Sequence, residues 1–230
     1  STEINGGLFW RTPRFVLNEW SLRGFSFAKD DELTPFFLEL EQELSVQDEI
    51  QAENYDLDSK ILQDACRSKN WKVVPARRMA PGCLKSNLCP NGCPTDAKQT
   101  MSRTFIPRGM RAGGEVLTGW RAINIVSRTH EVEIELENPQ GEKRKIISDG
   151  VIVSCGAIES RRLLKQSGLL RQKMGKIHLH VNCKVIVEFP EKIRSQDGTI
   201  FTHQLQEFID DGFLLMSSNF NASYLALAAS

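Results

Sequence analysis

Three cysteines that could bind iron lie close together in a stretch dense in Cys, Pro and Gly. Cys83, Cys89 and Cys93 fall within eleven residues, and Pro94 follows the last of them. Thiolates ligate the irons of iron–sulfur clusters, and a proline after the last ligand is typical of such sites. Zinc normally takes a fourth ligand at paired short spacings, and no histidine lies nearby. The spacing therefore indicates an iron–sulfur site, a disulfide between two of the three, or buried free thiols.

Glycines at two places would permit close approach of a ligand. Asn5-Gly6-Gly7 forms a turn or loop near the start of the chain, and glycine has no Cβ to keep a ligand from the backbone. Residues 151–157 read as an apolar strand that enters Gly156, with a helix behind it. A strand, a glycine turn and a helix make half of a nucleotide-binding α/β unit, because the helix N-terminus favours phosphate. Both features also occur as ordinary turns and junctions.

The four histidines form no catalytic pattern. His178 and His180 would share one face of a strand, where metal binding is conceivable but a structural role is favoured. Neither His130 nor His203 has a nucleophile or carboxylate at a spacing that indicates a catalytic pair. The chain also contains no Gly-x-Ser-x-Gly, Walker or His-Glu-x-x-His motif. The catalytic residue is therefore unknown at this point.

Helical and strand patterns alternate along the chain and must position these residues. Apolar spacing predicts helices at residues 34–44, 57–67, 98–112 (kinked at Pro107) and 158–166. Strands are expected at 71–74, 116–118, 123–126 and 151–157, and later at 184–189, 200–205 and 213–217, which read as a separate antiparallel sheet. Strict alternation over 131–137, a turn at 138–141 and a return over 143–147 predict a β-hairpin. The chain is thus of the mixed α/β (α+β) class, with a boundary near residue 176.

Charge and hydropathy exclude several classes of function. The chain carries 29 Lys and Arg against 29 Asp and Glu, so it lacks the excess of positive charge that nucleic-acid and membrane-surface binders need. No run approaches the roughly 18 apolar residues of a membrane span. The first residue is Ser1, and an apolar stretch without a stop signal ends at Ser230, so we expect both ends to continue in a longer protein.

Five segments, in order along the chain, resemble the glucose–methanol–choline (GMC) oxidoreductases. Ser1 to Pro13, with Trp20 behind them, are similar to the family's flavin-contacting segment. Residues 33–44 resemble the helix that follows it, 116–122 the strand that reaches the adenine, 156–169 the second signature, and 175–180 the segment that ends the domain. The chain departs from the signature at Arg161, where Pro or Ser is usual, and at Leu170, where Gly is usual. Together the segments cover nearly the whole chain.

The resemblance implies a fold and a cofactor. The fold would be a partial FAD-binding, Rossmann-like domain over residues 1–176, with the β-hairpin as an insertion, followed by the beginning of an antiparallel-sheet substrate domain over 177–230. The implied FAD contacts are Ser1 and Thr2 near the pyrophosphate, Asn5, Gly6 and Gly7 at the flavin, and Ala122, Gly156 and Ala157 along the adenosine arm.

The resemblance also implies a reaction, in which flavin N5 takes a hydride from the CH–OH group of a small-molecule alcohol. The family's Gly-x-Gly-x-x-Gly element and its C-terminal catalytic histidine are absent, so we expect a central fragment that is inactive alone. Some bacterial sugar dehydrogenases of this class bind a three-iron cluster through three cysteines at similar spacing. An iron–sulfur electron-transfer module on Cys83, Cys89 and Cys93, or an inactive fragment, is therefore the alternative. Neither the electron acceptor nor the compartment is assigned.

Overall fold

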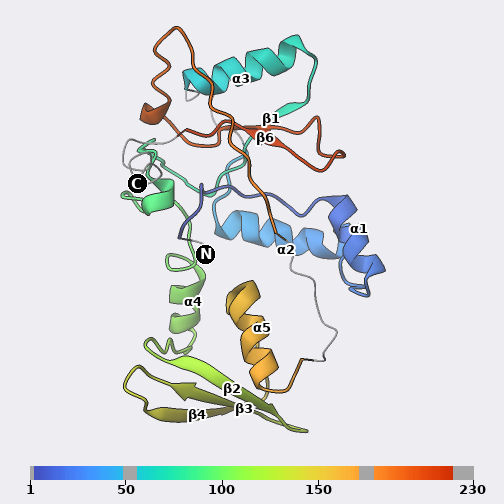
Figure 1. The fold of residues 1–230 in the computed structure, drawn as a ribbon, viewed down its shortest axis with the longest axis vertical. Coiled ribbons are helices and arrows are strands. Elements are labelled where there is room, and N and C mark those ends of the chain that lie inside the picture. Colours follow the sequence, from blue (N-terminus) through green and yellow to red (C-terminus); the bar gives the residue numbers. More distant parts are fainter. Residues whose placement is uncertain (1–2, 49–55, 171–178, 220–230) are drawn as a thin grey trace. The chain divides into compact units, whose positions relative to one another are not determined.

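The computed structural model describes residues 3–48, 56–170 and 179–219, and the chain divides into two compact units (Figure 1). Unit 1 comprises Ser1–Gly113 and Glu188–Ser230, and unit 2 comprises Gly114–Val187. The expected domain boundary near residue 176 lies outside the described residues and stays a prediction.

The α-helices of unit 1 are α1 (Arg14–Leu22), α2 (Asp30–Glu43), α3 (Leu57–Ser68) and α4 (Phe105–Arg111). The helix predicted at 57–67 is confirmed as α3. α2 begins at Asp30 rather than at residue 34, since three acidic residues in its first turn interact favourably with the helix dipole. α4 is shorter than the predicted 98–112. Pro107 lies in its first turn, where N–H groups have no partner within the helix, so the proline begins this helix instead of kinking it.

Unit 1 contains a small antiparallel sheet in the order β1–β5–β6. Its strands are β1 (Val73–Pro75), β5 (His203–Leu205) and β6 (Leu215–Met216), and α3 packs against β1 and β5. The prediction that the last strands form a sheet separate from what precedes them is wrong, because β1 pairs with β5 along the register Val73 to Leu205. β5 begins at His203 rather than at residue 200, since Phe201 has a left-handed φ of 58° that interrupts the extended chain.

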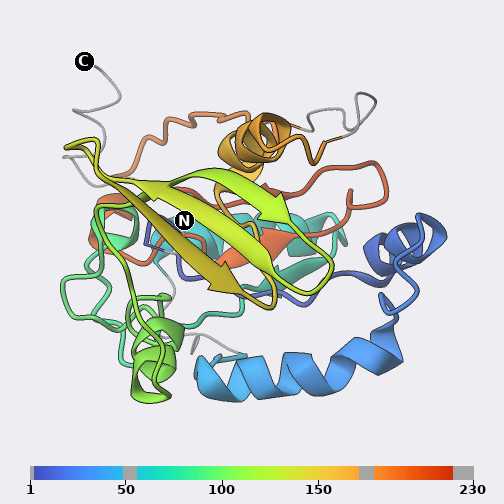
Figure 2. The same ribbon diagram turned by 90° about the horizontal axis from the view of Figure 1, so that it is seen from below.

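Unit 2 is a three-stranded antiparallel meander with one helix on it. β2 (Arg121–Ser127), β3 (Val132–Glu137) and β4 (Lys143–Ser148) pair in chain order, and α5 (Gly156–Gln166) packs against β2 (Figures 1 and 2). The predicted hairpin is confirmed, with Glu135 opposite Lys145 and Glu137 opposite Lys143 across the β3–β4 ladder. The Lys145 ammonium lies 2.6 Å from the Glu133 carboxylate. The buried side chains of Ile125, Leu136 and Leu163 form the core between sheet and helix.

Three predicted strands are absent from the described residues. Residues 116–118 lead into a turn at Gly119, whose φ is 76°, and neither 151–154 nor 184–189 forms a strand. The side chains of Ile152 and Ile186 are 92% and 95% exposed. An apolar run becomes a strand only where a neighbouring strand pairs with its backbone groups, so the apolar pattern alone predicted too much. The α/β class is confirmed, but the Rossmann-like strand–turn–helix expected around Gly156 consists here only of the turn and the helix.

Candidate functional site

A groove in unit 2 runs between the first residues of β2 and one side of α5, along the length of the helix. Its volume is about 650 Å³. It is lined by Trp120, Arg121, Ala122, Ile123, Glu137, Cys155, Glu159, Arg162, Leu163 and Gln166. Two of the segments expected to contact a cofactor therefore meet here, because Ala122 lines the groove together with Cys155, the residue directly before Gly156 and Ala157.

The strand side of the groove contains a β-bulge. Ala122 pairs with Leu136 and Asn124 pairs with Glu135, so Ile123 has no opposite residue on β3. A bulge takes backbone N–H and C=O groups out of the ladder and is frequent beside binding sites. The edge of β2 thus offers the backbone hydrogen bonds that a flat, ring-shaped ligand would need.

The helix side of the groove begins at a glycine that no other residue replaces easily. Gly156 has a φ of 84°, and a Cβ added there would meet no atom within 4 Å. The N-cap residue Cys155 makes no side-chain hydrogen bond to the first turn. In that turn, Glu159 accepts a hydrogen bond from Arg121 at 2.8 Å, which ties the helix start to β2. The free backbone N–H groups of a helix start favour a negatively charged or polar ligand.

The far end of α5 is fixed to β2 by Ser167 and Gly168. The backbone N–H of Ile125 donates to the Ser167 hydroxyl at 2.8 Å, and that hydroxyl donates to the carbonyl of Leu163 at 2.8 Å. Gly168 has a φ of 69°, and the N–H groups of Gly168 and Leu169 donate to the carbonyls of Lys165 and Leu164. This is a Schellman ending, in which glycine stops the helix. The Ser-Gly pair of the second signature therefore sets the spacing between helix and strand.

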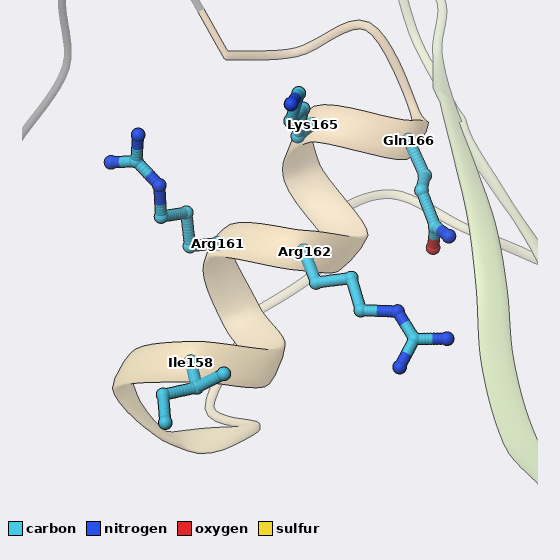
Figure 3. A pocket seen from close by; sticks show the side chains of 5 residues that line it. All are labelled: Ile158, Arg161, Arg162, Lys165 and Gln166. Atoms are coloured by element: carbon cyan, nitrogen blue, oxygen red, sulfur yellow. The ribbon is translucent and has the colours of Figure 1, made fainter.

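The outer face of α5 carries a second, shallower hollow of about 490 Å³. Ile158, Arg161, Arg162, Lys165 and Gln166 line it, and Figure 3 shows that Arg161 and Arg162 leave the helix in opposite directions. Because these cationic side chains do not converge on one point, we assign no ligand to this face.

The glycine loop near the start of the chain lies in unit 1 and is built by Asn5. The Asn5 side-chain oxygen accepts a hydrogen bond from the Gly7 N–H at 2.7 Å. Gly7 has a φ of 73°, and a Cβ at Gly6 would stand 2.5 Å from the ring of Phe201. Gly6 is therefore required for space and Gly7 for backbone conformation. The neighbouring Ser1 and Thr2 lie outside the described residues.

Two buried cations lie directly beneath this loop. Lys98 is 2% exposed, and its ammonium donates to the backbone carbonyls of Glu3, Asn5 and Cys89, the last at 2.6 Å. Arg78 is 3% exposed and donates to the carbonyl of Ile200 at 2.7 Å. Neither residue could be recognised from the sequence, because basic residues are ordinarily surface residues.

The three clustered cysteines make separate contacts. Arg78 lies 3.8 Å from the Cys89 sulfur, whereas the Cys83 sulfur accepts from the Lys85 N–H at 3.4 Å. Burial raises the pKa of the Cys89 thiol. Burial also acts to raise the pKa of the Cys93 thiol, but hydrogen bonds from Thr95 and nearby backbone N–H groups outweigh it, and the net shift is downward. Over residues 3–48, 56–170 and 179–219, no three His, Cys, Asp or Glu side chains are placed to hold a metal ion.

None of the described histidines lines either hollow of α5. His203 is fully buried in β5, where its ring nitrogens lie 3.2 Å from Gln63 and 3.1 Å from Thr202. Burial, together with the charge of Arg67, lowers the pKa of His203, so the neutral ring is favoured. His180 and His130 are exposed and line neither hollow of α5. His178 lies outside the described residues.

The chain is similar to known proteins along most of its length. Residues 1–182 match the family model described as GMC oxidoreductase. An uncharacterised GMC-type oxidoreductase of Mycobacterium tuberculosis is 27% identical over 95% of this chain and 36% of its own length. One of Sinorhizobium fredii is 26% identical, over 91% of this chain and 42% of its own. A long-chain-alcohol oxidase of Arabidopsis thaliana is 23% identical, over 85% of this chain and 28% of its own length.

The chain spans only about a third of the length of the first of these relatives. No solved structure matches the chain significantly. In the part of the chain that the structure describes, no helix has both the length and the apolar character required to cross a membrane.

Proposed function

The chain belongs to the GMC oxidoreductase family, and from this premise we propose that it supplies part of the FAD site of an enzyme that oxidises an alcohol. The observation that supports this most directly is the groove of unit 2. There Ala122, on the bulged edge of β2, lines one space with Cys155, the residue directly before the glycine start of α5. A ring that hydrogen-bonds to backbone and an attached polar sugar would suit these two walls, which is the character of an adenosine.

The residues of unit 1 suit the other end of the cofactor. We propose that Asn5, Gly6 and Gly7 contact the flavin and that Ser1 and Thr2 lie near the pyrophosphate. When bound, FAD supplies the acceptor for a hydride from the substrate CH–OH group. The loop's part is to place its backbone beside the ring, since Lys98 holds the carbonyls of Glu3 and Asn5 beneath the loop.

Two further parts of the proposal concern the domains and the substrate. We propose that residues 1–176 belong to the FAD domain and that 177–230 begin the substrate domain. A small-molecule alcohol is the proposed substrate class, since several relatives carry the name long-chain-alcohol oxidase. The base that accepts the alcohol proton stays unassigned.

A pair of glycine variants tests the groove. The protein is expressed from its complete gene and its flavin is measured by absorbance and by FAD titration. Gly156 and Gly141 have nearly equal φ values, 84° and 82°, and a Cβ at either would meet no atom within 4 Å. Alanine at either position costs about 1–2 kcal/mol of backbone strain. Gly156 directly follows Cys155, which lines the groove, whereas Gly141 lies in the turn between β3 and β4.

We expect Gly156→Ala to weaken FAD binding at least tenfold and Gly141→Ala to leave it within twofold of wild type. Wild-type protein that takes up no flavin and oxidises no alcohol would refute the proposed function. Equal weakening by both variants would show that the groove plays no special part.

The iron–sulfur alternative is distinguished by colour. A brown chromophore that disappears in Cys89→Ser would support a cluster on Cys83, Cys89 and Cys93. Yellow flavin absorbance alone, unchanged in that variant, would contradict it.

A further inference from the structure

The two cations beneath the Asn5–Gly7 loop differ in how completely they are paired. The Lys98 ammonium has three N–H donors and three carbonyl acceptors, those of Glu3, Asn5 and Cys89. It is therefore fully used in holding the loop to the cysteine segment. Lys98 is a positioning residue, since every bond it makes goes to backbone.

Arg78 is buried and incompletely paired. Its Nη1 donates to the Ile200 carbonyl and its Nη2 lies near the weak acceptor sulfur of Cys89, while its Nε has no hydrogen-bond partner among the described residues. The next residue, Arg77, is paired with the carboxylates of both Glu41 and Asp48. Across residues 3–48, 56–170 and 179–219, no such ion pair is found for Arg78. A buried cation without an anion is costly, so its retention calls for a reason.

The position of Arg78 beneath the loop supplies that reason. A Cβ at Gly7 would stand 3.7 Å from the Arg78 Nη2 and 3.6 Å from the Lys98 side chain. The side of Gly7 that has no Cβ thus faces the guanidinium, with no side chain between them. A charge held this close to a loop acts strongly on anything bound to that loop, because the buried surroundings screen it poorly.

We propose that Arg78 is the counter-charge that stabilises the reduced flavin bound at the Asn5–Gly7 loop. This inference rests on the proposed function. With FAD bound, hydride transfer would move two electrons and one hydrogen from the alcohol carbon to the flavin, while the alcohol proton would go to a base. One negative charge would remain on the ring system, where the Arg78 guanidinium would favour it. Arg78 therefore raises the affinity for reduced flavin relative to oxidised flavin, and with it the flavin's reduction potential.

Three variants test this role in the protein expressed from its complete gene. Arg78→Met removes the charge, Arg78→Lys keeps it, and Arg77→Met removes the same charge one residue away. The readout is the ratio of FAD affinities in the reduced and oxidised states, obtained from the midpoint potential of the bound flavin. We expect Arg78→Met to lower this ratio at least tenfold, which is about 30 mV for a two-electron couple. Arg78→Lys and Arg77→Met should stay within threefold of wild type.

Each outcome decides a different point. A ratio within threefold of wild type in flavin-loaded Arg78→Met would overturn the role of Arg78 and leave the proposed function standing. An equal fall in Arg77→Met would overturn it too, because the effect would then reflect net charge alone. Wild-type protein that binds no flavin would refute the proposed function, and the role of Arg78 with it. If Arg78→Met does not fold, Arg78→Gln replaces it, since its amide retains a donor for the Ile200 carbonyl.

Discussion

Replacing Glu41 by Gln removes the centre of an ion-pair network that holds the segment after the glycine loop to α2. The Glu41 carboxylate accepts hydrogen bonds from the Arg11 guanidinium at 2.6 Å and 2.7 Å, and from Arg77 at 2.5 Å. Arg77 also donates to Asp48 at 2.6 Å. Arg11 belongs to the segment that resembles the flavin-contacting part of the family, so this network fixes where that segment continues.

The size of the effect follows from the titration of Glu41. The hydrogen bonds from Arg11 and then Arg77 lower the pKa of Glu41 from 4.5 to about 2. A shift of that size corresponds to at most about 3 kcal/mol of stability. The Arg11 side chain is 36% exposed and solvent screens its charge, so we expect a loss of about 1–2 kcal/mol. Because the folded-state pKa is the lower one, this stability is present above about pH 4.5 and is lost as the pH falls towards 2.

Urea unfolding followed by circular dichroism between neutral and acidic pH measures this prediction. Wild type should lose stability over the interval in which Glu41 becomes protonated. The Glu41→Gln protein should be less stable than wild type at neutral pH, and its stability should change less across that interval. The matched control is Glu39→Gln, which removes one charge from the exposed face of the same helix. A Glu41→Gln protein as stable as Glu39→Gln at neutral pH, or with the same acid dependence as wild type, would refute the reasoning.

Two further predictions concern the elements that hold the sites. Gly6→Ala should cost about 1–3 kcal/mol, because its Cβ would stand 2.5 Å from the ring of Phe201. In thermal melts, the added change Phe201→Leu should restore much of that loss, and no recovery would mean that the ring is not the obstacle. Ser167→Ala should cost about 1–3 kcal/mol, since the buried Ile125 N–H loses its acceptor. Amide exchange at Ile125 should then become faster, and an unchanged rate would contradict the anchoring role.

The elements that could be predicted from sequence are those whose signals are local. The hairpin of β3 and β4 was confirmed because alternation, charge and turn all agree within one short stretch. The Asn138 side chain accepts from the N–H groups of Gln140 and Glu142, and Gly141 supplies the positive φ, so the turn is encoded in its own residues. α3 and α5 were likewise found from apolar spacing and a glycine or polar start.

The elements that were predicted wrongly are those that depend on partners distant in sequence. Residues 151–154 and 184–189 are apolar enough for strands, but a strand exists only when another pairs with it, and that pairing is not written in the segment itself. At β1 the predicted strand does form, because β5, from the far end of the chain, pairs with it. Local pattern could indicate that residues 71–74 were extended, but not where they would bind.

The candidate site divides in the same way. The glycines of the two predicted contact segments, and the second signature at 156–169, could be recognised from the sequence because backbone conformation is a local requirement. Arg78 and Lys98 were not, since their importance comes from burial beneath a loop more than seventy residues earlier in the chain, as the gap from Gly7 to Arg78 shows. A basic residue looks the same in sequence whether it lies in water or beneath a binding loop.

The family signature contains residues that need not touch a ligand, and the structure gives them a physical reason. Ser167 joins the end of α5 to the buried middle of β2, and Gly168 permits the turn that ends the helix. Lys98 does the same for the glycine loop through backbone carbonyls. Each anchor is a single polar group that hydrogen-bonds to buried backbone groups. Its loss therefore leaves a backbone group unpaired and also displaces a wall of the site. Substitutions at these anchors should therefore weaken binding and stability in parallel, whereas Arg78→Met should change the relative affinity for the two redox states of the flavin.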